Sequence, residues 1–213
     1  MKFTELQEIV GKEPVFETGL LLAGPIDPAS VRRQLSRLTA SGRLIQLRRG
    51  LYALAPPFVK ARPHPFLVAN HLVRGSYVSL QSALAYHGLI PEHVPVVTSV
   101  TTSRPGRRET PLGDFEYHHI KPEFFYGYDV IEVEGNQTAL VAGPEKAILD
   151  LVYLHPGSDS REYLDELRLE NLERLDLEEL GRLAESSGRP KLRRATAIVG
   201  TIARQEAEEY EAL

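Results

Sequence analysis

The chain has 213 residues, of which 42% are hydrophobic and 25% are charged, and it contains no cysteine. This composition is typical of a globular protein with one or two domains, and it excludes disulfide frameworks and thiolate zinc sites. No apolar run approaches the roughly twenty residues of a membrane span, and the N-terminal stretch MKFTELQEIV lacks the apolar core of a signal peptide, so we expect a cytoplasmic protein.

The net charge of −4 is unevenly distributed. Residues 28–60 contain seven Lys or Arg and no Asp or Glu, whereas residues 158–213 contain nine basic and fourteen acidic residues. A polyanion would respond to the local positive field of the first segment and not to the average of the whole chain.

The first sixty residues predict three helices followed by a hairpin. FTELQEIVG and VFETGLLLAG are two short helix-like segments. A third helix begins at Asp27 and Pro28, which suit the N-cap and the first helical position, and it ends at Ser41-Gly42. The segments RLIQLRR and GLYAL then predict two short strands around a tight turn at Arg49-Gly50.

The third predicted helix has an apolar and a polar side. Val31, Leu35 and Leu38 follow at helical spacing and make one narrow apolar face. The residues on the opposite face are Ser30, Arg33, Ser36 and Arg37.

This order of elements predicts a winged helix-turn-helix domain over residues 1–57. In that architecture the third helix enters the major groove of DNA, and the hairpin wing contacts the backbone or the minor groove. The polar helix face would then contact DNA, together with Arg48 and Arg49 at the tip of the wing. Two alternatives stay open: a solvated basic helix beside a hairpin, and a winged helix that contacts only protein.

A proline-rich segment at residues 55–65, APPFVKARPHP, predicts a linker, and a mixed α+β domain at residues 66–213 follows. Its expected elements are helices at 66–75, 79–90 and 143–156, a strand at 95–104, a loop at 105–113, a strand at 114–120, a hairpin around Gly135-Asn136, and a helical tail from about residue 158.

Four motifs in this order carry a family resemblance: LTASGRLIQLRRGLYAL, YVSLQSALAYHGLIPE, VTTSR and GPEKAILDLVY. Over about residues 1–155 the chain resembles the AbiEi family, the antitoxins of bacterial abortive-infection (phage-defense) toxin–antitoxin systems and related regulators. The resemblance implies a repressor that binds inverted repeats of double-stranded DNA in its own promoter, and a C-terminal domain that neutralises a nucleotidyltransferase-like toxin. It also implies that Arg32, Arg33 and Arg37 contact the groove, and that Arg48 and Arg49 are wing contacts.

Two further basic segments could contact phosphate, bind a partner or carry solvated charge. They contribute Arg107 and Arg108 on the predicted loop, and Lys191, Arg193 and Arg194 at the start of the last helix.

An enzyme is the third hypothesis, beside the regulator and the protein-interaction module. Asp114, Glu116 and His118 would share one face of a strand, as acid–base groups or metal ligands would. The solvent face of an ordinary strand has the same pattern, and no phosphate loop, HExxH helix or nucleophile elbow accompanies it. Lys146 and Asp150, at i and i+4, predict a supporting ion pair on a helix surface. We therefore expect no enzyme, no cofactor and no metal.

Overall fold

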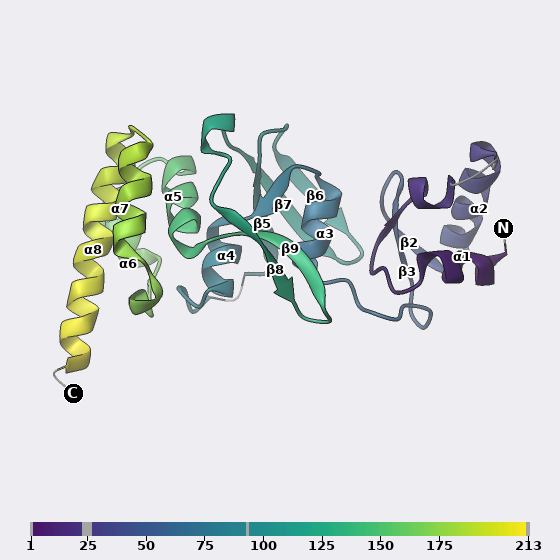
Figure 1. The fold of residues 1–213 in the computed structure, drawn as a ribbon, viewed down its shortest axis with the longest axis horizontal. Helices are drawn as coiled ribbons and strands as arrows, with labels where there is room; N and C mark the ends of the chain where they lie inside the picture. Colours follow the sequence, from purple (N-terminus) through teal and green to yellow (C-terminus); the bar gives the residue numbers. More distant parts are fainter. Residues whose placement is uncertain (1, 23–26, 93, 212–213) are drawn as a thin grey trace.

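The computed structural model describes residues 2–22, 27–92 and 94–211, and it shows an elongated α+β protein (Figure 1). An N-terminal unit lies at one end, a six-stranded sheet lies in the middle, and a layer of helices closes the other end. The expected mixed α+β class is confirmed. In the part of the chain that is described, no helix is long and apolar enough to cross a membrane.

The N-terminal unit packs helices against a small antiparallel sheet with the strand order β1-β3-β2. Its hydrophobic core is built around Leu6, Leu35 and Tyr52. The elements in chain order are α1 (Phe3–Val10), β1 (Phe16–Glu17), the 3₁₀ helix η1 (Thr18–Leu22), α2 (Pro28–Ala40), β2 (Leu44–Arg48) and β3 (Leu51–Leu54).

The second predicted helix is partly wrong. VFETGLLLAG forms the two-residue strand β1 and then η1. Phe16 pairs with Tyr52 of β3, so a long-range ladder overrides the local helical pattern. The end of the predicted helix, residues 23–24, lies outside the described residues.

The two faces of the hairpin β2–β3 pack against different hydrophobic cores. Leu44, Tyr52 and Leu54 face the N-terminal core. Leu47 and Leu51 belong instead to the core of the second unit. All four residues of β3 are buried, because this sheet lies between the two hydrophobic cores and not at the surface.

The second unit contains a mixed sheet with the strand order β6-β7-β5-β4-β9-β8. Helix α3 lies on one face, where the Tyr117 hydroxyl donates to the Ala69 carbonyl, and α4 and α5 cover the other. The strands are β4 (Ser76–Val78), β5 (Val96–Thr101), β6 (Gly106–Thr110), β7 (Gly113–His119), β8 (Tyr128–Val133) and β9 (Gln137–Ala142). The helices are α3 (Pro65–Leu72), α4 (Leu80–Tyr86), η2 (Pro122–Phe124), α5 (Pro144–Leu154), α6 (Arg161–Glu166), η3 (Leu172–Arg174), α7 (Leu177–Ser186) and α8 (Pro190–Glu211).

Two expectations for this unit have opposite outcomes. The hairpin around Gly135-Asn136 is confirmed, and both residues adopt the positive φ that such a turn needs. The predicted loop at 105–113 is wrong, because residues 106–110 form the edge strand β6 beside β7. An edge strand can be charged on both faces, so GRRET lacks the apolar alternation that marks a buried strand.

Candidate nucleic-acid interface

Helix α2 is fixed at its start by a side-chain cap and along its length by the N-terminal core. Asp27 accepts hydrogen bonds from the backbone N–H groups of Ala29 and Ser30, both at 3.0 Å, and Pro28 occupies the first turn. The apolar residues Val31, Leu35 and Leu38 are buried. The predicted helix and its core-facing side are therefore confirmed.

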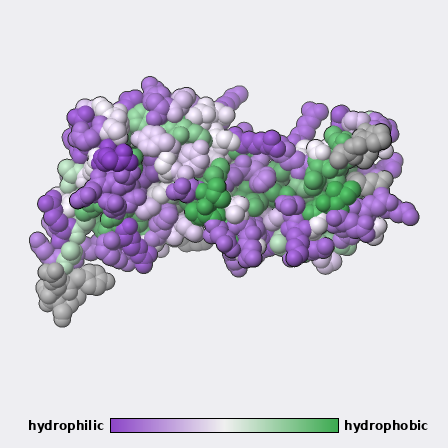
Figure 2. Space-filling model, viewed as in Figure 1, coloured by the Kyte–Doolittle hydropathy of each residue, from purple (hydrophilic) through white to green (hydrophobic). Residues whose placement is uncertain are grey.

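The other side of α2 carries uncompensated positive charge. Arg33 has Asp27 at 3.9 Å, but both side chains are more than half exposed. Within the described part of the chain, no carboxylate lies within 4 Å of Arg32 or Arg37. Hydrophilic side chains project from this end of the molecule in Figure 2. The exposed residues of this face, which we call the α2 face, are Ser30, Arg32, Arg33, Ser36 and Arg37.

The hairpin turn is held against the start of η1. Gly50 has φ of +85°, a conformation that glycine adopts without strain, and its carbonyl accepts a hydrogen bond from Thr18 N at 2.9 Å. Arg49 is exposed at this turn. The turn therefore places exposed Arg49 next in the chain to the residue that is bonded to the start of η1.

Arg48 does not lie free at a wing tip. Its guanidinium donates to Glu17 Oε1 at 3.0 Å and to the His71 carbonyl at 3.2 Å, and its side chain is only 35% exposed. These partners join β1, β2 and α3, so Arg48 connects the two units. The prediction placed Arg48 with Arg49, but the structure holds Arg48 half-buried at the junction, where the second unit packs against that face of the sheet.

A residue that the sequence did not single out completes this junction. Arg74, after α3, donates to Glu17 through Nε at 3.2 Å and through Nη2 at 2.5 Å, and its side chain is 74% exposed. One carboxylate therefore serves two arginines. No local motif indicates this pairing, because 57 residues separate Glu17 from Arg74.

Three of the five residues in the other basic segments pair with nearby acids, and the other two donate to backbone carbonyls. Arg107 lies 2.5 Å from Asp114 and 3.5 Å from Glu109, on β6 and not on a loop. Arg108 donates to the carbonyl of Arg107. On α8, Lys191 donates to the His155 carbonyl, while Arg193 pairs with Glu185 and Arg194 pairs with Asp159.

The candidate acid–base residues of β7 share one face, as expected, but they do not form a ligand cluster. Asp114 is engaged by Arg107, and His118 Nε2 lies 3.7 Å from Glu116. Burial lowers the pKa of His118, which favours its neutral form. Among the described residues, no group of three His, Asp or Glu side chains could hold a metal ion.

Lys146 and Asp150 pair as expected, but the pair is buried and not on a helix surface. Their side chains are 3% and 1% exposed. Asp150 also accepts hydrogen bonds from Tyr77 at 2.9 Å and Ser79 at 2.8 Å, and the Lys146 ammonium lies over the ring of Tyr126. All residues from Lys146 to Val152 are buried, because α5 packs between the sheet and the outer helices.

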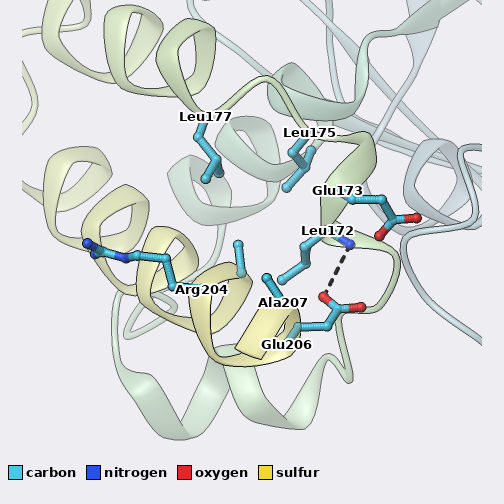
Figure 3. Close-up of a pocket in the computed structure, with 8 residues that line it drawn as sticks. Leu172, Glu173, Leu175, Leu177, Arg204, Glu206 and Ala207 are labelled. Carbon is cyan, nitrogen blue, oxygen red and sulfur yellow. Dashed lines mark hydrogen bonds between the residues drawn. The ribbon is translucent and has the colours of Figure 1, made fainter. Parts of the chain in front are cut away.

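An apolar groove lies at the opposite end of the molecule from α2 (Figure 3). Of its polar rim residues, Glu206 accepts from the backbone N–H groups of Asn171 and Leu172, and Arg204 donates to the Gly200 carbonyl of its own helix. These contacts cap η3 and hold α8 in place. The groove-lining leucines and alanines are Leu172, Leu175, Leu177, Ala203 and Ala207.

Residues 26–55, which comprise α2 and the hairpin, match the family model described as "Transcriptional regulator, AbiEi antitoxin". This segment matches the AbiEi family. The match confirms the resemblance found in the sequence over the residues that form the α2 face and the hairpin. No curated protein sequence matches the chain.

The fold of the chain is similar to a crystal structure of the RV2827C protein from Mycobacterium tuberculosis. The two chains are 21% identical, with a TM-score of 0.53, over 92% of this chain and 74% of that chain. At this identity the similarity shows the fold alone, so the functional argument depends on the AbiEi segment and on the side chains of this protein.

Proposed function

We propose that the N-terminal unit is a winged helix-turn-helix domain and that the protein is a sequence-specific, DNA-binding transcriptional repressor of its own promoter. In this assignment η1 and α2 form the helix-turn-helix, α2 is the recognition helix, and β2–β3 is a short wing. The AbiEi description of residues 26–55, a transcriptional regulator, supports it.

The observation that carries this proposal is the α2 face. One side of the helix is fixed in a hydrophobic core, and the other presents three exposed arginines. Among the described residues, only Arg33 of these three has a carboxylate nearby, at 3.9 Å. Guanidinium groups donate two parallel hydrogen bonds to guanine edges or to phosphates, and the serines of this face, Ser30 and Ser36, can bond to either. Arg49 at the hairpin turn would add a backbone contact.

We extend the proposal to an antitoxin role for the second unit, which would bind a nucleotidyltransferase-like toxin and act without catalysis. The support is the family that residues 26–55 of the N-terminal unit match, which is described as an antitoxin. Co-expression of the chain with a neighbouring toxin gene tests the antitoxin role separately. We expect the chain to restore the growth that the toxin inhibits and to co-purify with the toxin. A toxin that stays active and does not co-purify would remove the antitoxin role and leave the repressor role intact.

The DNA proposal is tested by binding of the full chain to the DNA immediately upstream of its own gene, with unrelated DNA as competitor, at two salt concentrations. We expect preferential, salt-sensitive binding. Arg33→Ala and Arg37→Ala should each reduce the preference by about 1–3 kcal/mol for every base that the arginine hydrogen-bonds. Arg49→Ala should weaken binding to every sequence and reduce the salt dependence.

Arg182→Ala, on the exposed side of α7 and paired with Glu179, is the matched control and should bind like the parent. If the parent shows no preference, or if all three DNA-face variants bind like the control, the interface assignment is wrong. If the chain binds a protein partner and shows no DNA preference, the result would favour the protein-interaction module. One side of the hairpin already packs against the second unit.

A further inference from the structure

The junction between the two units contains more arginines than carboxylates. Glu17 is shared by Arg48 and Arg74, which leaves one excess positive charge, and exposed Arg49 adds a second. The charge of Glu13 also acts on His71 at this junction and offsets one of these two charges, so one excess positive charge remains. Burial lowers the pKa of His71, so this histidine adds little positive charge at neutral pH.

The three arginines are not equally available. Arg48 is 35% exposed and is held by Glu17 and by the His71 carbonyl. Arg74 is 74% exposed, and it donates to Glu17 through Nε and Nη2, so its Nη1 can face solvent. Glu17 therefore holds the Arg74 guanidinium in a fixed orientation with part of its donor edge still open.

Glu17, Arg48 and Arg74 are connected to η1, the segment that precedes α2 in the chain. Glu17 directly precedes η1, and Gly50 of the hairpin turn is bonded to Thr18 at the start of η1. In a helix-turn-helix the first helix crosses the DNA backbone while the second enters the groove. In the proposed helix-turn-helix, the residues at the start of η1 would therefore lie beside the phosphate backbone.

We propose that Arg74, in the second unit, is a DNA-phosphate contact that acts beside Arg49. The inference rests on the proposed DNA-binding function and extends the contact surface from the N-terminal domain onto the second unit. Because Arg48 bonds to the His71 carbonyl and Glu17 pairs with Arg74, the two units are joined here, and the DNA would contact both the α2 face and the junction.

The test compares three variants of the full chain on the promoter fragment over a range of salt concentrations. Arg74→Gln should remove one phosphate contact and make the negative slope of log K against log[salt] less steep by about 0.9. At 0.1 M salt the binding constant should fall about eightfold, the factor that this slope gives over the decade below 1 M. The preference for promoter over unrelated DNA should not change, because phosphate contacts carry no sequence information.

Arg168→Gln is the matched control, since Arg168 is also an exposed arginine of the second unit, 71% exposed and paired with Glu92. It should keep the parental slope. Glu17→Gln distinguishes a contact from a merely structural role, because it breaks the same ion pair but keeps both arginines. We expect Glu17→Gln to bind at least as tightly as the parent, with the parental slope.

Two outcomes overturn the inference while the proposed function stands. One is an Arg74→Gln slope equal to that of the parent and of Arg168→Gln. The other is an equal loss of affinity in Arg74→Gln and Glu17→Gln, which would show that the ion pair only holds the two units together. If the parent itself shows no preference for promoter DNA, the proposed function and this inference both fail.

Discussion

The buried pair Lys146–Asp150 gives the most quantitative prediction. Asp150→Asn keeps the shape of the side chain, and its amide oxygen can still accept from Tyr77 and Ser79. It removes the carboxylate that compensates the Lys146 ammonium, whose side chain is 3% exposed. The substitution therefore removes the negative charge of the side chain and leaves its packing unchanged.

The expected loss is about 3–5 kcal/mol of unfolding free energy, the cost of leaving one member of a buried pair uncompensated. The structure also limits this loss, because the lysine can release its proton. Neutralising a lysine with an unfolded pKa of about 10.4 at pH 7 costs about 4.6 kcal/mol, at 1.36 kcal/mol for each unit. Burial already lowers the pKa of Lys146, with Asp150 opposing this effect, so removing Asp150 favours that release.

Urea-induced unfolding at pH 7 is the assay, with Asp165→Asn as the matched control. Asp165 pairs with Arg161 at the same i, i+4 spacing as the buried pair, with 2.8 Å between Arg161 Nε and Asp165 Oδ1. Both side chains of this control pair are about half exposed. The control should lose no more than about 0.5 kcal/mol. The double variant Lys146→Met/Asp150→Asn should recover most of the lost stability, because neither charge of the pair remains.

The pH dependence gives a second, independent signature. In Asp150→Asn the buried lysine releases its proton at a lower pH in the folded state than in the unfolded state. The unfolded state then binds more protons, so stability should rise between pH 7 and pH 9 by up to about 1.4 kcal/mol per unit. The reasoning is refuted if Asp150→Asn costs no more than Asp165→Asn, or if its stability does not rise with pH and the double variant is no better.

Three further predictions concern the core, the cap of α2 and the histidines. Leu35→Ala should lower the unfolding free energy by about 2–5 kcal/mol, because it opens a cavity where Leu35 is fully buried in the N-terminal core. Urea unfolding measures this loss, and an unfolding midpoint equal to that of the parent would contradict the prediction. Asp27→Ala should cost about 1 kcal/mol by removing the N-cap, while Asp27→Asn should retain most of it; equal losses would argue against a cap. Burial lowers the pKa of His118, with Glu116 opposing it and His155 adding to it, so the unfolded state takes up the proton first. Stability should therefore be full above the unfolded pKa of about 6.5 and fall as the pH drops below it, and His118→Asn should flatten this fall in acid unfolding curves.

Local pattern was sufficient to predict the elements that depend on local chemistry. Asp27-Pro28 marked the start of α2, Gly50 and the Gly135-Asn136 pair marked turns, and helical spacing identified the side of α2 that packs in the core. These features depend on residues a few positions apart, so one sequence shows them directly.

The features that were missed depend on partners far along the chain. Phe16 and Glu17 form a strand because β3 lies beside them, and the edge strand β6 has no apolar face that would reveal it. The spacing of Lys146 and Asp150 indicated a pair but not its depth, because burial is decided by the elements that pack around α5. Propensity and spacing cannot show such long-range contacts.

Arg48 and Arg49 show how this difference affects the interpretation of a basic segment. The two arginines are neighbours in one motif, and the motif alone gives them the same role. In the structure Arg48 donates to Glu17 and to the His71 carbonyl of the second unit, while Arg49 stays exposed. Since the same carboxylate also holds exposed Arg74, the charge that the wing loses at Arg48 is matched by an arginine that the second unit brings to the same place. The arrangement of the two units, and not the arginine motif alone, therefore determines which cations face the solvent at this junction.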